Sequence, residues 1–282
     1  MESARAQPGA RPEPKPDQPM EMITALRELI KCKDLLYMIT LREIKVKYVQ
    51  SMMGFLWAIL MPMLVISAGI LVRVVMAHLS NTRVGLSEIA SVSVKSLPWS
   101  FFVASIRFAT NSLVADTNLV TKIYFPREIL PLSSVLSQLV DFAVASVVLT
   151  VFLIVAGVGV NVYLFWVPYL LVIMFIFCTA LGLLLAATNL FFRDVKYIVE
   201  VFLTFAIFFT PVFYDAKIAG RWEWLLLINP MAPILENLSW IVVYGQPPDY
   251  FWMTYSSLMA VGGLVVAVHV FKKLEPKFAE SV

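Results

Sequence analysis

Long apolar runs separated by short polar breaks are the feature that most constrains how this chain can fold. Residues 130–156 and 163–189, for example, are each apolar and long enough to cross a bilayer as a helix, which needs about 20 residues. Hydrophobic residues make up 60% of the 282 positions and charged residues only 15%, too few to cover a soluble protein of this size. Because the runs are continuous rather than alternating, helices are favoured over a membrane-spanning barrel. We therefore expect an all-α integral membrane protein.

Six transmembrane helices are predicted from these runs. They are expected at residues 54–76, 97–117, 130–156, 163–189, 197–214 and 250–271. Between the fifth and the sixth span, residues 212–245 are apolar, but the region is broken by Pro211, Gly220, Pro230, Pro233 and Pro247. Such a segment is too fragmented for a span, and it predicts short re-entrant helices that enter the outer leaflet.

The segments that flank the spans are more polar. Residues 1–22 are rich in Pro, Ala and Glu and predict a disordered cytoplasmic tail. Residues 23–52 mix apolar residues with lysines and arginines, which predicts an amphipathic helix in the cytoplasmic membrane surface, with an ordinary soluble helix as the alternative. Residues 53–271 are then the transmembrane domain, and residues 272–282 form a cytoplasmic tail.

The distribution of basic residues orients the spans. Most lysines and arginines fall in the N-terminal helix, after the second span, after the fourth span and in the C-terminal tail. A six-span arrangement places all four of these segments on one side of the membrane. By the positive-inside rule that side is the cytoplasm, so both termini are expected there.

A polar break at residues 118–128 separates the second span from the third. It carries Lys122, Pro126 and Arg127 between two apolar runs. Charged groups and irregular backbone are costly in hydrocarbon, so this segment must lie at a membrane face. In a transport protein, a soluble partner can bind at such a face and drive a conformational change.

The sequence lacks the residue patterns of several chemistries. These 282 residues contain no Gly-x-x-x-x-Gly-Lys-Ser/Thr string, so no P-loop for ATP is expected on this chain. The two histidines, His78 and His269, lie far apart, and Cys32 and Cys178 have no metal-site spacing. Neither a metal site nor a Ser/His/Asp triad is expected. An enzyme is therefore disfavoured, and a transport subunit is favoured.

Five segments, taken in order, are similar to a known family. They are LREIKVKYVQSMMGFLWAILMPML, LPWSFF, NLVTKIYFPREILPLSSVLSQLVDF, NLFFRDVKYIV, and TPVFY followed by LINPMAPILE. The pattern resembles the permease subunits of type-2 ABC exporters that move O-antigen, capsule or teichoic acid polysaccharides. One departure is the run RVGLSEIASVSVKS before the second span, which is more polar than the family's usual run there.

The resemblance implies a homodimer in the inner (cytoplasmic) membrane of the cell. Each copy would sit on one copy of a separate cytoplasmic ABC ATPase, which would hold the ATP and Mg²⁺. The substrate would be a polysaccharide attached to a lipid through a phosphate or pyrophosphate. Two other functions stay open: a small-molecule or drug exporter of the same superfamily, and an ion-coupled lipid flippase that needs no ATPase.

The resemblance also assigns ATPase coupling to the polar break. The residues it implies are Lys122, Tyr124, Phe125, Pro126, Arg127 and Glu128, with Arg193 and Asp194 in the next cytoplasmic loop as a second contact. Glu128 would lie in the first turn of a helix that Pro126 starts, near the positive end of its dipole. The alternative is a plain basic turn that only enforces topology.

Two isolated charges in the second and third spans suggest an ion pair. Arg107 and Asp141 each lie 17 residues from Tyr124 (124 − 107 and 141 − 124), so an antiparallel hairpin would place them at similar depth. A lone charge at mid-span costs about 2.5–3.5 kcal/mol on insertion scales, which favours pairing. Alternatively, Arg107 meets the substrate phosphate. Glu200 is then available to a basic partner such as Lys45 or Lys47.

Aromatic and basic residues suggest how substrate is contacted. Phe202, Phe205 and Phe209 share one helical face. Sugar C–H faces pack on aromatic rings, and the family lines its channel with the first and fifth spans, so we expect Phe55, Trp57 and Met61 of the first span to contribute too. Helix packing or lipid contact is the alternative. The basic residues expected to meet the lipid phosphate are Arg42, Lys45, Lys47 and Arg107, with membrane anchoring as the alternative for the first three.

Overall fold

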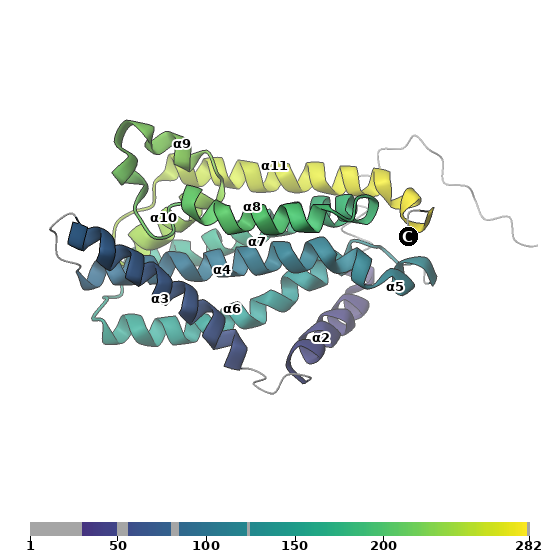
Figure 1. Ribbon diagram of the computed structural model, residues 1–282, viewed down its shortest axis with the longest axis horizontal. Coiled ribbons are helices and arrows are strands. Elements are labelled where there is room, and N and C mark those ends of the chain that lie inside the picture. The colour runs from purple at the N-terminus through teal and green to yellow at the C-terminus, as the bar shows by residue number, and fades with distance from the viewer. Residues whose placement is uncertain (1–29, 50–55, 80–84, 123–124, 281–282) are drawn as a thin grey trace, which may run out of the picture.

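The computed structural model describes residues 30–49, 56–79, 85–122 and 125–280, and every element within these ranges is a helix. Most helices run along the long axis of the molecule (Figure 1). The elements are α2 (Lys33–Val49), α3 (Leu56–Leu79), α4 (Leu86–Ala115), α5 (Thr117–Lys122), α6 (Ile129–Val155), η1 (Val162–Phe165), α7 (Trp166–Phe191), α8 (Val195–Phe209), η2 (Ala216–Trp222), α9 (Glu223–Leu227), α10 (Met231–Val242), α11 (Tyr250–Leu274) and η3 (Glu275–Glu280).

The prediction of an all-helical membrane protein is confirmed. Four described stretches are long and apolar enough to cross a membrane: Leu86–Ala115, Ile129–Val155, Val162–Phe191 and Tyr250–Phe278. The other two predicted spans coincide with α3 and α8. The 15 residues of α8 extend only about 22 Å at 1.5 Å per residue, which is less than the hydrocarbon thickness.

The second predicted span begins earlier than expected. α4 starts at Leu86, whereas the prediction started at residue 97. The intervening residues include several polar ones, and Ser91, Ser93 and Lys95 among them are buried inside the protein. Buried polar groups need partners: other segments of the chain bond to Ser91 and Lys95, while Ser93 donates to the Ile89 carbonyl of the same helix. This partly polar stretch therefore extends a buried helix rather than forming a loop.

The segment between α8 and α11 consists of short helices, η2, α9 and α10. Gly220 interrupts η2 with a φ of +54°, a conformation that few residues other than glycine adopt. α10 is enclosed by protein, and Leu235 and Ile241 on it are fully buried. The expected fragmentation of residues 212–245 is therefore observed.

The centre of the bundle is the contact between α4 and α7. It is close because Gly182 of α7 faces Ala109 of α4, and a Cβ on the glycine would lie 2.9 Å from the Ala109 Cβ. α6 and α3 pack on α4, while α11 packs on α7. One apolar core fills the end of the bundle near α10, and a second joins α7 and α11 to the segment after α5.

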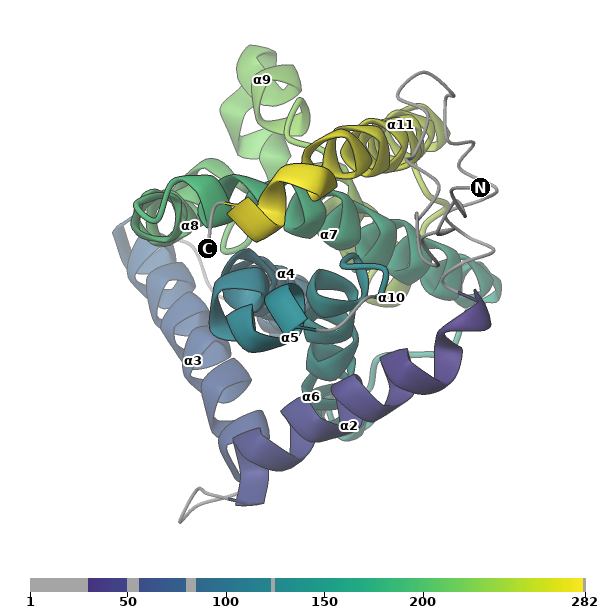
Figure 2. The same ribbon diagram turned by 90° about the vertical axis from the view of Figure 1, so that its right-hand side faces the viewer.

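The N-terminal helix α2 lies across the end of the bundle and docks on α6 (Figure 2). Glu43 accepts hydrogen bonds from the hydroxyls of Ser133 at 3.0 Å and Ser134 at 3.1 Å. Lys47 Nζ donates to Gln138 Oε1 at 2.9 Å. The sequence predicts that the cationic side of α2 faces headgroups and water. In the structure, part of this polar face contacts α6 instead. The predicted tail, residues 1–22, lies outside the described residues.

Candidate functional site

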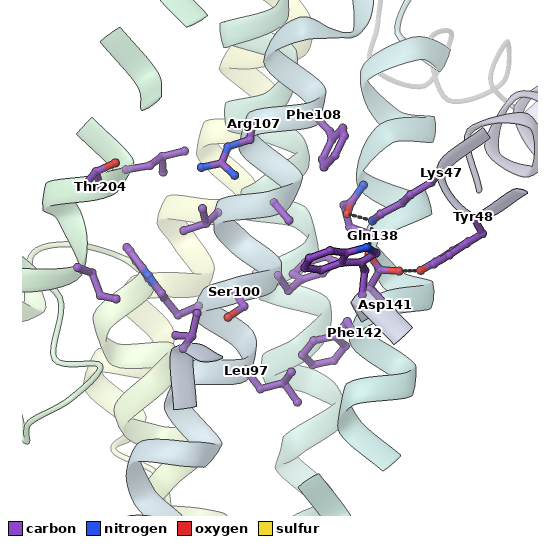
Figure 3. A pocket seen from close by; sticks show the side chains of 18 residues that line it. Lys47, Tyr48, Leu97, Ser100, Arg107, Phe108, Gln138, Asp141, Phe142 and Thr204 are labelled. Atoms are coloured by element: carbon purple, nitrogen blue, oxygen red, sulfur yellow. Dashed lines mark hydrogen bonds and ion pairs between the residues drawn. The ribbon is translucent and has the colours of Figure 1, made fainter. Parts of the chain in front are cut away.

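A cavity of about 630 Å³ lies among α3, α4, α6 and α8, and residues near the end of α2 complete it (Figure 3). Its walls are mainly apolar. They include Trp57, Val65, Leu97, Trp99, Phe101, Val103, Phe108, Phe142, Leu203 and Ile207. The polar lining residues are Lys47, Tyr48, Ser100, Arg107, Gln138, Asp141 and Thr204. An apolar cavity with a few charged groups suits an amphipathic ligand. We call it the α3–α8 pocket.

Both cations of this pocket are paired with carboxylates. The Arg107 Nε lies 2.8 Å from Glu200 Oε1, and its Nη2 donates to Glu200 Oε2 at 3.0 Å. Lys47 forms an ion pair with Asp141, which also accepts a hydrogen bond from the Tyr48 hydroxyl. The pocket therefore presents its positive charges already neutralised.

The predicted direct pair between Arg107 and Asp141 is wrong. Both residues line the α3–α8 pocket, but each is bonded to a different helix: Arg107 to α8 and Asp141 to α2. In Figure 3, Asp141 points toward Lys47 and Tyr48 and apart from Arg107. The hairpin geometry gave similar depth for the two charges. It did not account for α2 and α8, which each bring an opposite charge closer.

The other basic residues predicted to meet a lipid phosphate lie outside this pocket. Arg42 forms an ion pair with Asp116, and Lys45 is exposed on α2. Of the four predicted cations, the structure therefore brings Lys47 and Arg107 to one cavity and leaves Arg42 and Lys45 apart from it.

The aromatic residues predicted to line a channel divide into two groups. Trp57 lines the α3–α8 pocket. Phe202, Phe205 and Phe209 are instead 58–71% exposed on α8, while Leu203 and Ile207 of the same helix line the pocket. Phe55 and the side chain of Met61 lie outside the described residues.

The polar break at residues 118–128 contains most of α5 and ends at the start of α6, and two of its last residues are packed against the protein. Phe125 is buried in the core shared by α7 and α11, and Glu128, at the start of α6, is 3% exposed. Burial raises the pKa of the Glu128 carboxyl, and the ion pair with Lys272 acts in the opposite direction. Pro126 and Arg127 are half-buried. Tyr124 and the Lys122 side chain lie outside the described residues.

The second predicted contact loop is open to solvent. Arg193 and Asp194 are both exposed where α7 ends and α8 begins. Their side chains are accessible to a partner, in contrast to those of Phe125 and Glu128.

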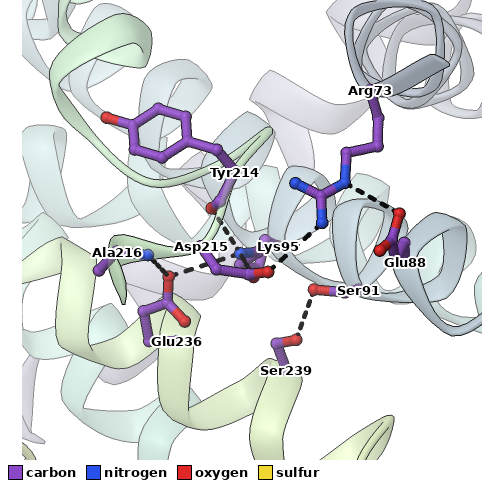
Figure 4. Close-up of polar contacts among 9 residues, drawn as sticks. All are labelled: Arg73, Glu88, Ser91, Lys95, Tyr214, Asp215, Ala216, Glu236 and Ser239. Atoms are coloured by element: carbon purple, nitrogen blue, oxygen red, sulfur yellow. Dashed lines mark hydrogen bonds and ion pairs between the residues drawn. The ribbon is translucent and has the colours of Figure 1, made fainter. Parts of the chain in front are cut away.

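A buried cluster of charges at the other end of the bundle was not predicted (Figure 4). Lys95 of α4 is 0% exposed, and its Nζ donates to the Tyr214 carbonyl at 2.7 Å and to Asp215 Oδ1 at 2.8 Å. It also lies 3.5 Å from Glu236 Oε1, which accepts the Ala216 N–H at 2.8 Å. The cluster therefore ties α4 to α10 and to the segment before η2.

Further polar contacts extend this cluster to α3. The guanidinium of Arg73 lies 3.2 Å from Glu88 Oε2 and 3.6 Å from Asp215 Oδ2, and Ser91 is 2.7 Å from Ser239. We call this set the Lys95 cluster. The signal in the sequence was the run before the second span, RVGLSEIASVSVKS, which is more polar than expected from the family resemblance and contains Lys95. Its partners could not be inferred, because Asp215 and Glu236 come more than a hundred residues later.

Comparisons with known proteins agree with this architecture. Residues 34–243 match the family model described as ABC-2 type transporter. Two proteins of Klebsiella pneumoniae, both named O-antigen export system permease protein RfbA, are 30% and 28% identical over 254 and 252 residues, each covering 88% of this chain and 94% of the relative.

A protein of the same name from Myxococcus xanthus is 28% identical over 264 residues, covering 93% of this chain and 100% of the relative. These matches, together with the apolar helices, confirm the resemblance seen in the sequence. The chain is a membrane protein that belongs to the ABC-2 type transporter family.

Proposed function

We propose that this chain is the membrane-spanning subunit of an ATP-driven exporter of lipid-linked polysaccharide, of the O-antigen kind, out of the cytoplasm. The observation that carries the proposal is the α3–α8 pocket, an apolar cavity with two cations, in a chain similar to O-antigen export permeases. Because the sequence has no P-loop, ATP and Mg²⁺ would bind to a separate cytoplasmic ATPase. Two copies of this chain and two of the ATPase would form the complex.

The proposed membrane arrangement has six spans, formed by α3, α4, α6, α7, α8 and α11. α8 is short, and its crossing would be completed by the segment that follows it, while α9 and α10 would enter the outer leaflet. α2, α5 and the C-terminal end of α11 lie toward the same end of the bundle (Figure 1). Basic residues gather in these segments, which supports placing that end and both termini in the cytoplasm of a cell with this chain in its inner membrane.

The α3–α8 pocket would receive the lipid-phosphate part of the substrate. Its apolar walls suit acyl or isoprenoid chains, and Lys47 and Arg107 suit a phosphate. Each cation is now held by a carboxylate, Asp141 or Glu200, so a phosphate oxygen would replace that carboxylate oxygen on entry. Arg42 and Lys45, which lie outside the pocket on α2, would act earlier by attracting the anionic headgroup to the membrane surface.

The exposed aromatic face of α8 would line the path of the sugar chain. Phe202, Phe205 and Phe209 contact little in the single chain, and their exposure suits a surface that faces a second copy across a channel. Trp57, with Phe55 and Met61 of the first span, would continue this lining. Aromatic rings give sugars a contact that slides more easily than a ring of charges.

The two loops at the cytoplasmic end would receive the force from the ATPase. Exposed Arg193 and Asp194 would touch the ATPase directly, as would Lys122, Tyr124, Pro126 and Arg127 of the polar break. Phe125 and Glu128 are buried, so their part in coupling would be to hold this break against α7 and α11.

Co-purification with a cytoplasmic ABC ATPase of the same cell tests the proposal. We expect a complex whose ATP hydrolysis rises when lipid-linked polysaccharide is added. Replacing both exposed residues, Arg193→Ala with Asp194→Ala, is expected to weaken the complex, whereas Lys217→Ala at the opposite end is not. Failure of the wild-type chain to bind any ATPase would overturn the proposal, and ATP hydrolysis raised only by small amphipathic drugs would favour a small-molecule exporter.

A further inference from the structure

The segment that follows α11 is bonded to the polar break between α4 and α6. The Arg127 guanidinium donates from Nη1 to the Glu275 carbonyl at 2.6 Å, and the Arg127 backbone N–H donates to Glu275 Oε1 at 3.3 Å. The two residues are 148 positions apart in the sequence. One hydrogen bond comes from the Arg127 backbone and the other from the Arg127 side chain. Glu275 therefore fixes both the position of Arg127 and the direction of its side chain.

A buried ion pair strengthens the same junction. Lys272, in the last turn of α11, places its Nζ 2.7 Å from Glu128 Oε1 and 3.2 Å from Glu275 Oε2. Glu128 is 3% exposed, and a carboxylate buried to this degree is costly unless it is paired. The end of α11 therefore supplies the countercharge that the start of α6 requires.

Phe278 joins this junction to the second cytoplasmic loop. Its side chain is 0% exposed and lies 5.1 Å from the Phe271 ring of α11 and 5.8 Å from the Phe191 ring, centroid to centroid. Phe191 ends α7, directly before the loop that carries Arg193 and Asp194. The Arg127 guanidinium lies 5.8 Å from the centre of the Phe278 ring. One buried ring thus lies beside Arg127 of the polar break and beside Phe191, where the second candidate ATPase-facing loop begins.

The opposite end of α11 is bonded to the short helices of residues 212–245. The Tyr255 hydroxyl donates to the Ile228 carbonyl at 2.7 Å, and the Ser256 hydroxyl to the Pro230 carbonyl at 3.0 Å. The Asp249 N–H donates to Asn237 Oδ1 at 2.6 Å. α11 is continuous from these contacts to Leu274, so it links the polar break at one end to α9 and α10 at the other.

We propose that Lys272, Glu275 and Phe278 are positioning residues for coupling, which fix the ATPase-facing break to α11 so that its displacement moves α11 and the outer short helices. This inference rests on the proposed function. It adds a second route by which a movement of the polar break reaches the other end of the molecule, through α11 and not through the hairpin of α4 and α6. The three residues act through Arg127, Glu128 and the loop after Phe191. They need no contact of their own with the ATPase.

Transport per ATP hydrolysed separates this role from simple stabilisation. The assay uses the full complex in lipid, with lipid-linked polysaccharide as substrate. The variants are Phe278→Ala and Glu275→Ala, which removes the carboxylate that accepts from the Arg127 N–H and pairs with Lys272. Complex formation and basal ATP hydrolysis are expected to stay close to wild type, while transport per ATP falls by about tenfold. The conservative variants Phe278→Leu and Glu275→Gln should retain most of the wild-type transport.

Lys273→Gln is the matched control, because Lys273 is the exposed neighbour of Lys272 and should change nothing. Unchanged transport per ATP in both the Phe278→Ala and the Glu275→Ala variant would overturn this inference. So would equal losses of complex, hydrolysis and transport that the conservative variants do not recover. A wild-type chain that binds no ATPase would instead overturn the proposed function, so the two failures are distinguishable.

Discussion

Arg107 of α4 and Glu200 of α8 form a two-pronged ion pair at the α3–α8 pocket, with the Arg107 Nε 2.8 Å from Glu200 Oε1 and its Nη2 3.0 Å from Oε2. A planar guanidinium held in this way can bind a phosphate with the same two donors. The pair is half exposed, so its value to stability is small, and its position on the pocket is its more important property.

Arg107→Ala is expected to lower the affinity for lipid-linked polysaccharide by about 10- to 100-fold, because hydrogen bonds to charged groups contribute about 1.5–3 kcal/mol. Glu200→Gln removes the competing carboxylate and should leave the affinity unchanged or raise it. The measurement is the substrate concentration that half-stimulates ATP hydrolysis. Arg221→Ala, at the opposite end of the molecule, is the control. Equal affinity in wild type and Arg107→Ala would contradict a phosphate role for this residue.

Lys95→Met is expected to destabilise the protein by about 3 kcal/mol or more, since it leaves the carboxylates of Asp215 and Glu236 without their buried countercharge. Thermal unfolding of the purified protein measures the effect. Adding Glu236→Gln to Lys95→Met should recover part of the loss, because one of the two carboxylates is then neutral. The exposed Lys217→Met serves as a control. A melting temperature unchanged by Lys95→Met would show that the Lys95 cluster does not hold the segment between α8 and α11 in place.

Gly182→Ala is expected to cost about 1–3 kcal/mol, since the added Cβ would lie 2.9 Å from the Ala109 Cβ and force α4 and α7 apart. Gly262→Ala on α11 is a matched control, because nothing lies within 4 Å of its Cβ position. Alanine favours a helix over glycine by about 1 kcal/mol, so this control should be neutral or stabilising. If the two variants melted at the same temperature, the close α4–α7 contact would not limit stability.

Phe205→Ala is expected to reduce export without lowering the melting temperature, because this side chain is 58% exposed in the single chain and contributes little to its core. Phe205→Tyr keeps an aromatic ring and should retain export. The polymer that appears outside the cell, relative to the amount of permease in the membrane, is the quantity to compare. Normal export by both Phe205→Ala and Phe209→Ala would argue that this face of α8 contacts lipid instead of substrate.

Glu43 should make stability depend on pH. Burial raises the pKa of its carboxyl above the ordinary value of 4.5, although the Ser133 and Ser134 hydroxyls act in the opposite direction. The folded protein therefore keeps this proton to higher pH than the unfolded chain, and stability falls as the pH rises from about 4.5 through the raised pKa.

Glu43→Gln keeps an oxygen that can accept from both serines and removes the charge. Its melting temperature should vary less with pH and exceed that of wild type at pH values above the raised pKa. The exposed Asp34→Asn on the same helix is the control. A pH profile that is identical in wild type and Glu43→Gln would contradict the assignment.

The positions of the long helices could be predicted because each follows from a local property, an unbroken apolar run. Residues 130–156 coincide with α6 to within a residue at each end. The start of α4 could not be predicted in this way. Lys95 of α4 can be fully buried because Asp215 and Glu236 neutralise its charge, and no residue close to Lys95 in the sequence indicates those partners.

The candidate site likewise has features that the sequence predicts and features that depend on distant parts of the chain. Spacing placed Arg107 and Asp141 at similar depth, and both do line the α3–α8 pocket. The direction in which a side chain leaves its helix depends on rotation about the helix axis and on which neighbours pack there. These follow from the positions of α2 and α8, which the hairpin argument did not include. The sequence suggests a pair between Glu200 and Lys45 or Lys47, whereas in the structure Glu200 pairs with Arg107 and Lys47 with Asp141.

Transport in proteoliposomes tests the central claim most directly. This chain and its ATPase would be reconstituted together, with lipid-linked polysaccharide in the outer leaflet on the ATPase side and a sugar-specific label trapped on the other. The account predicts that the label binds polysaccharide only when ATP and Mg²⁺ are added, and that Arg107→Ala slows the reaction. Polysaccharide that crosses at the same rate without the ATPase or without ATP would contradict the account.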